Sequence, residues 1–230
     1  MKLDLLSELN VERSARRGAV VVTDIETGAQ RLVRGEGLKG DPLAEELREY
    51  LGLGKSGLIE REGHHFFLNV QTPPVRAVIV GAVHVSQVLA PLMRNLDLDV
   101  TIIDPRAAFA TPERFPDVPV VIEWPDKVLP ALGLDAYTAL AVLTHDPRID
   151  DPALIAALRA DCFYIGALGS RKTHERRVER FKEAGFSEAD IARIHAPIGL
   201  DIGAASPGEI AVSILAEMIA TLRKDRRRTA

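Results

Sequence analysis

The sequence has 230 residues and is poor in cysteine and in long apolar runs. Because Cys162 is its single cysteine, no intrachain disulfide can form. No apolar stretch approaches the roughly 20 residues that a membrane-spanning helix needs. Residues 1–10 carry acids where a signal peptide would need an uninterrupted apolar core. We therefore expect a cytoplasmic protein with no membrane partner.

An excess of positive charge is also missing, since 29 Lys and Arg stand against 33 Asp and Glu, a net charge of -4. This balance argues against a general nucleic-acid binder. The one strongly basic run, residues 223–228, is most simply a solvated tail. Apolar residues make up 47% of the chain, an ordinary share for a globular protein. The length suits one large domain or two smaller ones.

The most informative stretch is a βαβ pattern in the middle of the chain. An apolar strand over residues 77–80 leads into a Gly81-Ala82 turn, an amphipathic helix over residues 84–95, and a second apolar run that ends at Asp104. Such a unit offers the unpaired N–H groups of a helix N-terminus to a phosphate. Asp104 lies 23 positions after Gly81, about where these folds place a carboxylate on a ribose hydroxyl.

The glycine fingerprint of this unit is incomplete. A Gly-x-Gly-x-x-Gly motif would need glycines at positions 81, 83 and 86, but the chain has Gly81, Val83 and Ser86. Ser86 is small enough for close packing of helix on strand. Val83 places a β-branched side chain where the pyrophosphate must approach the backbone. A dinucleotide site and a purely architectural βαβ unit therefore both remain open.

Residues 1–73 predict a small α+β domain. We expect a helix over residues 2–17, hairpins that pair 19–25 with 30–33 and 58–60 with 65–70, and a short helix from 42 to about 51. Asp41 is the expected N-cap of the short helix, with Pro42 at its first position. The stiff Pro73-Pro74 pair marks the expected domain boundary.

Residues 74–230 predict the second domain, in which apolar strands alternate with helices. Further strands are expected at 120–122, 139–143 and 162–165, and further helices at 125–132, 151–160, 171–184, from 187, and 206–223. Ser206 and Glu209 have the spacing of a capping box for the last helix. This alternation predicts an α/β fold with a doubly wound parallel sheet, covered on both faces.

Polar residues follow several of these strands, and ligands of open parallel sheets bind outside the carboxyl ends of the strands. The candidate ligand-binding residues at this edge are Gly81, Ala82, Val83, His84, Asp104, Arg106, Thr144, His145, Asp146, Gly166, Gly169, Ser170 and Arg171. Asp104 could hold a ribose, or Arg106 a phosphate. His145 and Asp146 could perform acid–base chemistry or orient a polar heterocycle, although Asp146 before Pro147 also commonly stabilises a turn.

The segment GALGSR, residues 166–171, places a glycine loop between a strand and a helix. With Ser170 as N-cap, its free N–H groups and Arg171 favour an anion site, and a plain strand-to-helix turn is the alternative. No residues predict a metal site, because His64 and His65 are adjacent and would face opposite sides of a strand. Cys162 is expected in the core.

Several of these segments resemble the XdhC/CoxI family. The similar segments are DPR at 104–106, FATPERF at 109–115, THDP at 144–147, DDPAL at 150–154, YIGALGSRKTH at 164–174, IHAPIGLDIGA at 194–204 and EIAVSILAE at 209–217. The similarity extends over about residues 76–222. It implies a Rossmann-like domain in an accessory factor of molybdenum hydroxylases such as xanthine dehydrogenase or carbon monoxide dehydrogenase.

The resemblance implies that the chain binds molybdenum cofactor, presents it for sulfuration by a cysteine desulfurase, and delivers it to the apoenzyme as a chaperone rather than a catalyst. The family's Gly-Ala-Gly-His turn is Gly81-Ala82-Val83-His84 here, which argues against bound NAD(P). The family's N-terminal Gly-Gly-Cys segment corresponds to Gly40-Asp41, without cysteine. An NAD(P)-dependent oxidoreductase, or a protein–protein adaptor with a vestigial site, are the alternatives, and a homodimer is left open.

The side chain of Val83 generates the first testable prediction. Calorimetry should show little or no binding of NAD(H) or NADP(H), because the β-branched side chain obstructs the pyrophosphate. Val83→Gly should improve this binding if the rest of the site is intact. Tight dinucleotide binding by the unmodified chain would contradict the prediction and favour the oxidoreductase.

Overall fold

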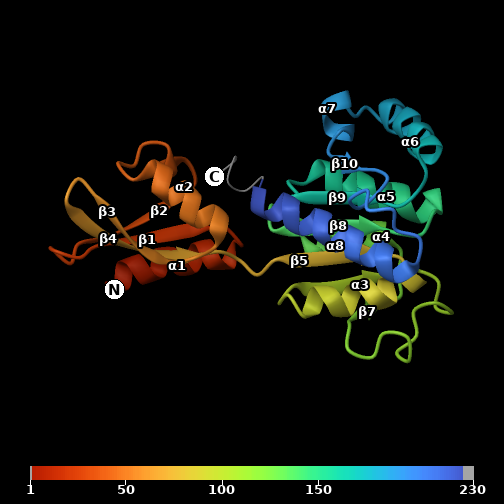
Figure 1. The fold of residues 1–230 in the computed structure, drawn as a ribbon, viewed down its shortest axis with the longest axis horizontal. Coiled ribbons are helices and arrows are strands. Elements are labelled where there is room, and N and C mark those ends of the chain that lie inside the picture. Colours follow the sequence, from red (N-terminus) through yellow and green to blue (C-terminus); the bar gives the residue numbers. More distant parts are fainter. Residues whose placement is uncertain (1, 225–230) are drawn as a thin grey trace. The chain divides into compact units, whose positions relative to one another are not determined.

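The computed structural model describes residues 2–224 and divides the chain into two compact units (Figure 1). Unit 1 comprises the chain up to Pro73 together with the residues from Leu222 onward, and unit 2 comprises Pro74–Thr221. The division after Pro73 coincides with the expected boundary, but the end of the last helix groups with unit 1 rather than with residues 74–221. Residues 225–228 of the basic run lie outside the described residues. Over residues 2–224, every helix is too short or too polar to cross a membrane.

Unit 1 contains a four-stranded antiparallel sheet in the order β2-β1-β4-β3. Both expected hairpins are confirmed, with Val20 opposite Val33 and Ile59 opposite Phe66. Leu47 packs with Val20 and the rest of a buried apolar cluster. The elements are α1 (Leu3–Ser14), β1 (Ala19–Asp24), β2 (Gln30–Arg34), a 3-10 turn η1 (Gly35–Leu38), α2 (Ala44–Leu53), β3 (Gly57–Arg61) and β4 (His64–Gln71).

The expected start of α2 is wrong by two residues, because the helix begins at Ala44. Asp41 Oδ1 accepts the N–H of Leu43 at 2.9 Å, so its carboxylate closes the turn before the helix instead of capping the helix. Arg31 also donates two hydrogen bonds to the Asp41 carboxylate, at 3.0 and 2.7 Å. Pro42 therefore lies in the turn, outside the first helical position.

Unit 2 contains a six-stranded parallel sheet in the order β10-β9-β8-β5-β6-β7. Counted along the chain from β5, the order is 3-2-1-4-5-6, the strand order of dinucleotide-binding α/β domains, and it reverses between β5 and β8. The predicted doubly wound α/β fold is confirmed. The elements are β5 (Arg76–Val80), α3 (His84–Arg94), β6 (Asp99–Ile103), β7 (Val120–Val121), α4 (Pro125–Leu132), β8 (Thr138–Val142), α5 (Pro147–Arg159), β9 (Tyr164–Ala167), α6 (Arg171–Glu183), α7 (Glu188–Ile191), β10 (Ile194–His195) and α8 (Pro207–Lys224).

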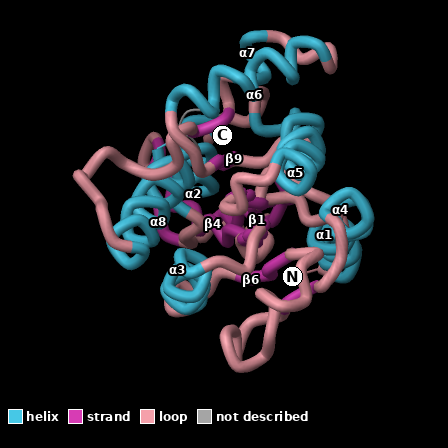
Figure 2. The backbone as a smooth tube through the Cα atoms, turned by 90° about the vertical axis from the view of Figure 1, so that its right-hand side faces the viewer, coloured by secondary structure: helices cyan, strands magenta, loops and turns pink. Residues whose placement is uncertain are grey.

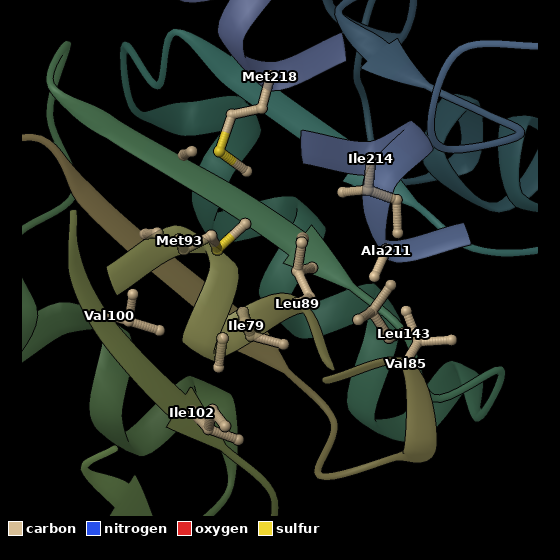
Figure 3. Packing of buried hydrophobic residues seen from close by; sticks show 14 of the residues in the cluster. Ile79, Val85, Leu89, Met93, Val100, Ile102, Leu143, Ala211, Ile214 and Met218 are labelled. Atoms are coloured by element: carbon tan, nitrogen blue, oxygen red, sulfur yellow. The ribbon is translucent and has the colours of Figure 1, made fainter. Parts of the chain in front are cut away.

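Helices cover both faces of this sheet, with α3 and α8 on one face and α4 and α5 on the other (Figure 2). Alternate residues of each strand point to opposite faces, so Ile79 of β5 joins the cluster of α3 and α8 while Val80 joins the other. On the first face, Leu89 and Ile214 pack close to Ile79 (Figure 3). The apolar strands are therefore buried on both sides, as their composition predicts.

The expected start of α5 is also wrong, because the helix begins at Pro147 rather than at Asp151-Pro152. Asp146 is the N-cap, and its Oδ1 accepts the N–H of Arg148 at 3.0 Å. Two Asp-Pro pairs five residues apart compete as start signals, and the first one is used. Pro152 lies inside the helix, where it lacks the N–H that would bond to the carbonyl of Arg148.

Replacement of Leu89 by alanine should measure how much the α3 face of the core contributes to stability. Leu89 is fully buried, so Leu89→Ala should lower the free energy of unfolding by about 2–5 kcal/mol in urea denaturation. Val88, its neighbour in α3, is 38% exposed, and Val88→Ala is the matched control, expected within about 0.5 kcal/mol of the unmodified chain. Equal losses for the two variants would contradict the assigned orientation of α3.

Candidate functional site

The strand register brings the predicted site segments to one edge of the sheet. Val80 pairs with Ile103 and with Val142, and Val142 pairs with Ala167, so the ends of β5, β6, β8 and β9 are level. The residues that follow are Gly81, Asp104, Leu143-Thr144 and Leu168-Gly169. All of them continue at the carboxyl edge of the sheet, beside the point where the strand order reverses.

The turn after β5 needs its glycine and its serine. Gly81 has a φ of +118°, and a Cβ there would lie 2.8 Å from Cγ2 of Thr144. The buried Ser86 hydroxyl donates to the carbonyl of Gly81 and accepts the N–H of Val83 at 3.4 Å. Ser86 thus fixes the turn from the position of the missing third glycine. Val83 is the N-cap of α3 and supplies no side-chain cap, and His84 after it is exposed.

The Asp104 carboxylate is fully buried and is already used by protein donors. It accepts the N–H of Ala82 at 2.7 Å, the N–H of Arg106 at 2.9 Å, and two guanidinium hydrogen bonds from Arg106 at 2.9 and 2.7 Å. Burial alone would raise the pKa of Asp104, but these hydrogen bonds and the Arg106 charge hold it below its usual value. Of the two roles expected for this segment, the structure leaves the arginine available rather than the carboxylate.

The loop after β8 holds a buried hydrogen-bond chain and one exposed imidazole. The Thr144 hydroxyl donates to Asp150 Oδ1 at 2.5 Å and accepts the N–H of Asp146 at 3.0 Å. Burial raises the pKa of Asp150, against the hydrogen bond from Thr144. His145 between them is exposed and has a φ of +66°, a left-handed conformation that costs energy for a non-glycine residue. His145, rather than Thr144, is therefore free to contact a ligand.

Asp146 is paired with Arg148, which donates from its backbone N–H and from two guanidinium nitrogens at 3.1 and 2.8 Å. These hydrogen bonds lower the pKa of Asp146 to about 2. A carboxylate with this pKa stays ionised near neutral pH and is poorly suited to proton transfer. We assign Asp146 to the helix N-cap rather than to acid–base chemistry.

The loop after β9 has the expected cap. Ser170 is the N-cap of α6, and its Oγ accepts the N–H of Thr173 at 3.3 Å. Gly169 has a φ of +138° beside the Thr173 side chain, and Arg171 is exposed at the first helical position. Gly166 serves packing instead, because a Cβ there would lie 2.5 Å from Ile198.

Residues 77–218 match the family model described as the XdhC Rossmann domain. The chain belongs to this family. The resemblance found in the sequence is therefore confirmed, and so is the Rossmann fold of unit 2.

Similar proteins include curated relatives and a solved structure. YqeB of Escherichia coli K12, described as uncharacterized, is 31% identical over 66% of this chain and 28% of its own length. The E. coli molybdenum cofactor insertion chaperone PaoD is 40% identical over 37% of this chain and 27% of its own. A Bacillus subtilis protein described as a probable xanthine dehydrogenase component is 29% identical over 70% of this chain and 47% of its own.

The crystal structure of a xanthine dehydrogenase from Bacillus halodurans is similar in fold, with a TM-score of 0.73 at 22% identity. That match covers 100% of this chain and 70% of the crystallised one. The chain thus spans less than half the length of the curated relatives that it matches.

The XdhC Rossmann domain also contains a buried arginine that the sequence pattern did not single out. Arg177 of α6 is 2% exposed, and its Nη2 lies 3.8 Å from Asp150 and 3.4 Å from the carbonyl of Leu168. Over residues 2–224, its Nε and Nη1 have no hydrogen-bond partner. Arg177 thus lies between the loops after β8 and β9. Its spacing of four residues from the buried Phe181 was the available signal, because both lie on one helical face.

A second missed cluster lies beside the edge strand β10. His195 has a partner after all, since its Nδ1 is 3.2 Å from Glu217 of α8. The other Glu217 oxygen accepts the Tyr164 hydroxyl at 2.7 Å and the N–H of Gly199 at 2.8 Å. These residues are far apart in the sequence, so no local pattern could have joined them.

Two further expectations concern thiol and metal chemistry. Cys162 is buried in the core, as expected, and burial raises its pKa to about 12, so the thiol is unreactive. Within residues 2–224, no group of three or more His, Cys, Asp or Glu residues could hold a metal ion.

The depressed pKa of Asp146 predicts a pH-dependent contribution to stability. A carboxylate whose pKa falls from 3.8 to about 2 on folding stabilises the fold above pH 4 and loses this contribution as the pH falls toward 2. Asparagine is an equally good N-cap, so Asp146→Asn removes only the charge. Urea denaturation between pH 3 and 7 should show the largest destabilisation of the variant above pH 5. A difference that stays constant with pH would refute the ion pair with Arg148.

Proposed function

We propose that this XdhC domain binds molybdenum cofactor and supports the maturation of a molybdenum hydroxylase of the xanthine dehydrogenase or carbon monoxide dehydrogenase type. The observation that carries the proposal is the carboxyl edge of the sheet, where two glycine turns each lead into a helix N-terminus. The 40% identity with PaoD, named a molybdenum cofactor insertion chaperone, supports this choice of cargo.

The residues at this edge suit an anionic pterin. A cofactor phosphate fits the start of α6, where Ser170 caps the helix and Arg171 is an exposed cation. The exposed His145 is available to the pterin ring, while the Thr144 hydroxyl is held by Asp150. The cofactor supplies the redox and oxygen-transfer chemistry when it reaches its enzyme, and the chain's own residues bind and orient it.

Sulfuration of the cargo would need a sulfur donor from outside the described chain. Cys162 is buried, with a pKa near 12, and cannot act as the attacking thiolate. We therefore propose a cysteine desulfurase as one partner, with the molybdenum hydroxylase apoenzyme as the recipient. A cofactor-binding chaperone, which catalyses no step itself, is the role that these residues support.

An NAD(P)-dependent oxidoreductase is the second candidate, and the strand order 3-2-1-4-5-6 favours it. Two observations weigh against it. Val83 stands at the N-cap of α3 where the pyrophosphate would approach, and the Asp104 carboxylate is occupied by Arg106. Neither observation affects a pterin phosphate bound at α6.

Ser170 and Arg171 should lose different properties when replaced. Ser170→Ala should lower stability by about 0.5–2 kcal/mol through the lost cap and should weaken molybdopterin binding. Arg171→Ala should leave thermal melting unchanged, because its side chain is exposed, but should lower molybdopterin affinity, more strongly at low salt. Binding of purified molybdopterin, its transfer to an apo-hydroxylase, and melting curves of both variants make the test.

Arg176 provides the matched control, because it is an exposed arginine in α6 beyond the first turn. Arg176→Ala removes the same charge and should leave affinity unchanged. An Arg171→Ala protein that binds and delivers cofactor like the unmodified chain would make this loop an ordinary turn. Failure of the unmodified chain to bind molybdopterin would overturn the proposed function itself.

A further inference from the structure

Arg106 presents an unused nitrogen at the carboxyl end of β6. Its Nε and Nη2 donate to the two Asp104 oxygens, and its side chain remains 33% exposed. Within residues 2–224, Nη1 has no hydrogen-bond partner and is not buried. The bidentate pair with Asp104 fixes the guanidinium plane, so Nη1 is held in place without a protein acceptor.

Arg114 brings a second guanidinium group to the same place. Its Nη1 donates to the carbonyls of Ala82 and Phe109, at 2.9 and 2.6 Å, and its Nη2 donates to Gln87 Oε1 at 3.0 Å. The loop after β6 is thereby tied to the turn after β5. All three acceptors are neutral, so these hydrogen bonds fix the position of Arg114 without balancing its charge.

The Phe109 ring connects the two arginines. Its centroid lies 4.6 Å from the guanidinium carbon of Arg106 and 6.0 Å from that of Arg114. Phe109 is 44% exposed, an unusual position for a large apolar ring unless it packs against a ligand or a cation. Both cations are thus confined to one corner, which we call the β6 corner: Asp104, Arg106, Phe109 and Arg114.

The β6 corner carries a net positive charge. Asp104 balances Arg106, and no acid balances Arg114 within residues 2–224. Glu113, the nearest acid in sequence, bonds to Thr111 instead. Asp146 acts on Arg106 only through its charge and is itself paired with Arg148.

We propose that the β6 corner is a phosphate subsite, in which Arg106 and Arg114 select a phosphomonoester over a ribose diol. A diol at this position needs a free carboxylate as acceptor, and the Asp104 carboxylate already accepts four hydrogen bonds. A phosphate needs donors and positive charge, which Arg106 Nη1 and Arg114 supply. The inference rests on the proposed function for the edge at which the ligand lies, and it adds a second anion position, on the opposite side of β5 and β8 from Ser170.

A matched pair of nucleotides tests the subsite: adenosine 2′,5′-bisphosphate and AMP, which differ only in the 2′-phosphate. Calorimetry should show the bisphosphate binding roughly tenfold or more tightly than AMP, as expected for charge-assisted hydrogen bonds. The difference should shrink as salt concentration rises. Equal affinities at low salt would overturn the inference.

Two substitutions in the corner should act in opposite directions. Arg114→Gln should reduce bisphosphate affinity toward that of AMP, because it removes the unbalanced charge. Asp104→Asn should increase bisphosphate affinity, because it removes the charge that competes for Arg106 while an amide oxygen still faces the N–H of Ala82. A general disturbance of the loop would weaken binding in both variants, and that result would overturn the inference even if Arg114→Gln folded poorly.

Arg193 provides the control, because it also donates to backbone carbonyls, those of Leu158 and Ala160, both at 2.8 Å. It precedes β10 at the amino edge of the sheet, so Arg193→Gln should leave both nucleotide affinities unchanged. A parallel titration with molybdopterin separates the two proposals. Selective bisphosphate binding without molybdopterin binding would retain the subsite and refute the proposed cargo, and the reverse result would refute only the subsite.

Discussion

The buried carboxylate of Asp104 is the constraint on which the carboxyl edge of the sheet depends. A carboxylate without solvent exposure is costly unless several donors surround it, and Asp104 has four, from Ala82 and Arg106. The bond to Ala82 joins the loop after β6 to the turn after β5, and Arg114 joins the same two segments through the carbonyl of Ala82. The turn, the arginine fork and the exposed Phe109 ring are therefore one assembly, and a change in any of them displaces the others.

The parts of the fold that follow from local physics could be predicted from the sequence. The β5-α3-β6 unit has a strand buried on both faces, a glycine turn and an amphipathic helix within some thirty residues, so its pattern is self-contained. The caps at Ser170, Ser187 and Ser206 were predictable for the same reason, since each depends on the next three residues. Together these signals were enough to predict a doubly wound sheet.

The remaining features depend on contacts that no short pattern encodes. The start of α5 was wrong because Asp146-Pro147 and Asp151-Pro152 are equally good signals, and packing decides between them. Within the candidate site, the sequence placed Asp104 and Arg106 together but could not show that they bind each other. The link from Thr144 through Asp150 to Arg177 joins three elements, and the link of Glu217 with Tyr164 spans 53 residues.

The place of α8 in the core has a consequence for synthesis on the ribosome. Ala211, Ile214 and Met218 supply part of the apolar cluster that covers β5 and α3, and Glu217 ties the same helix to Tyr164 of β9 (Figure 3). A chain that has emerged only as far as β9 can form five parallel strands, yet one face of that sheet still lacks its second helix. The nascent Rossmann domain therefore exposes a wide apolar surface until α8 has been made, and this interval is when a holding chaperone would bind it.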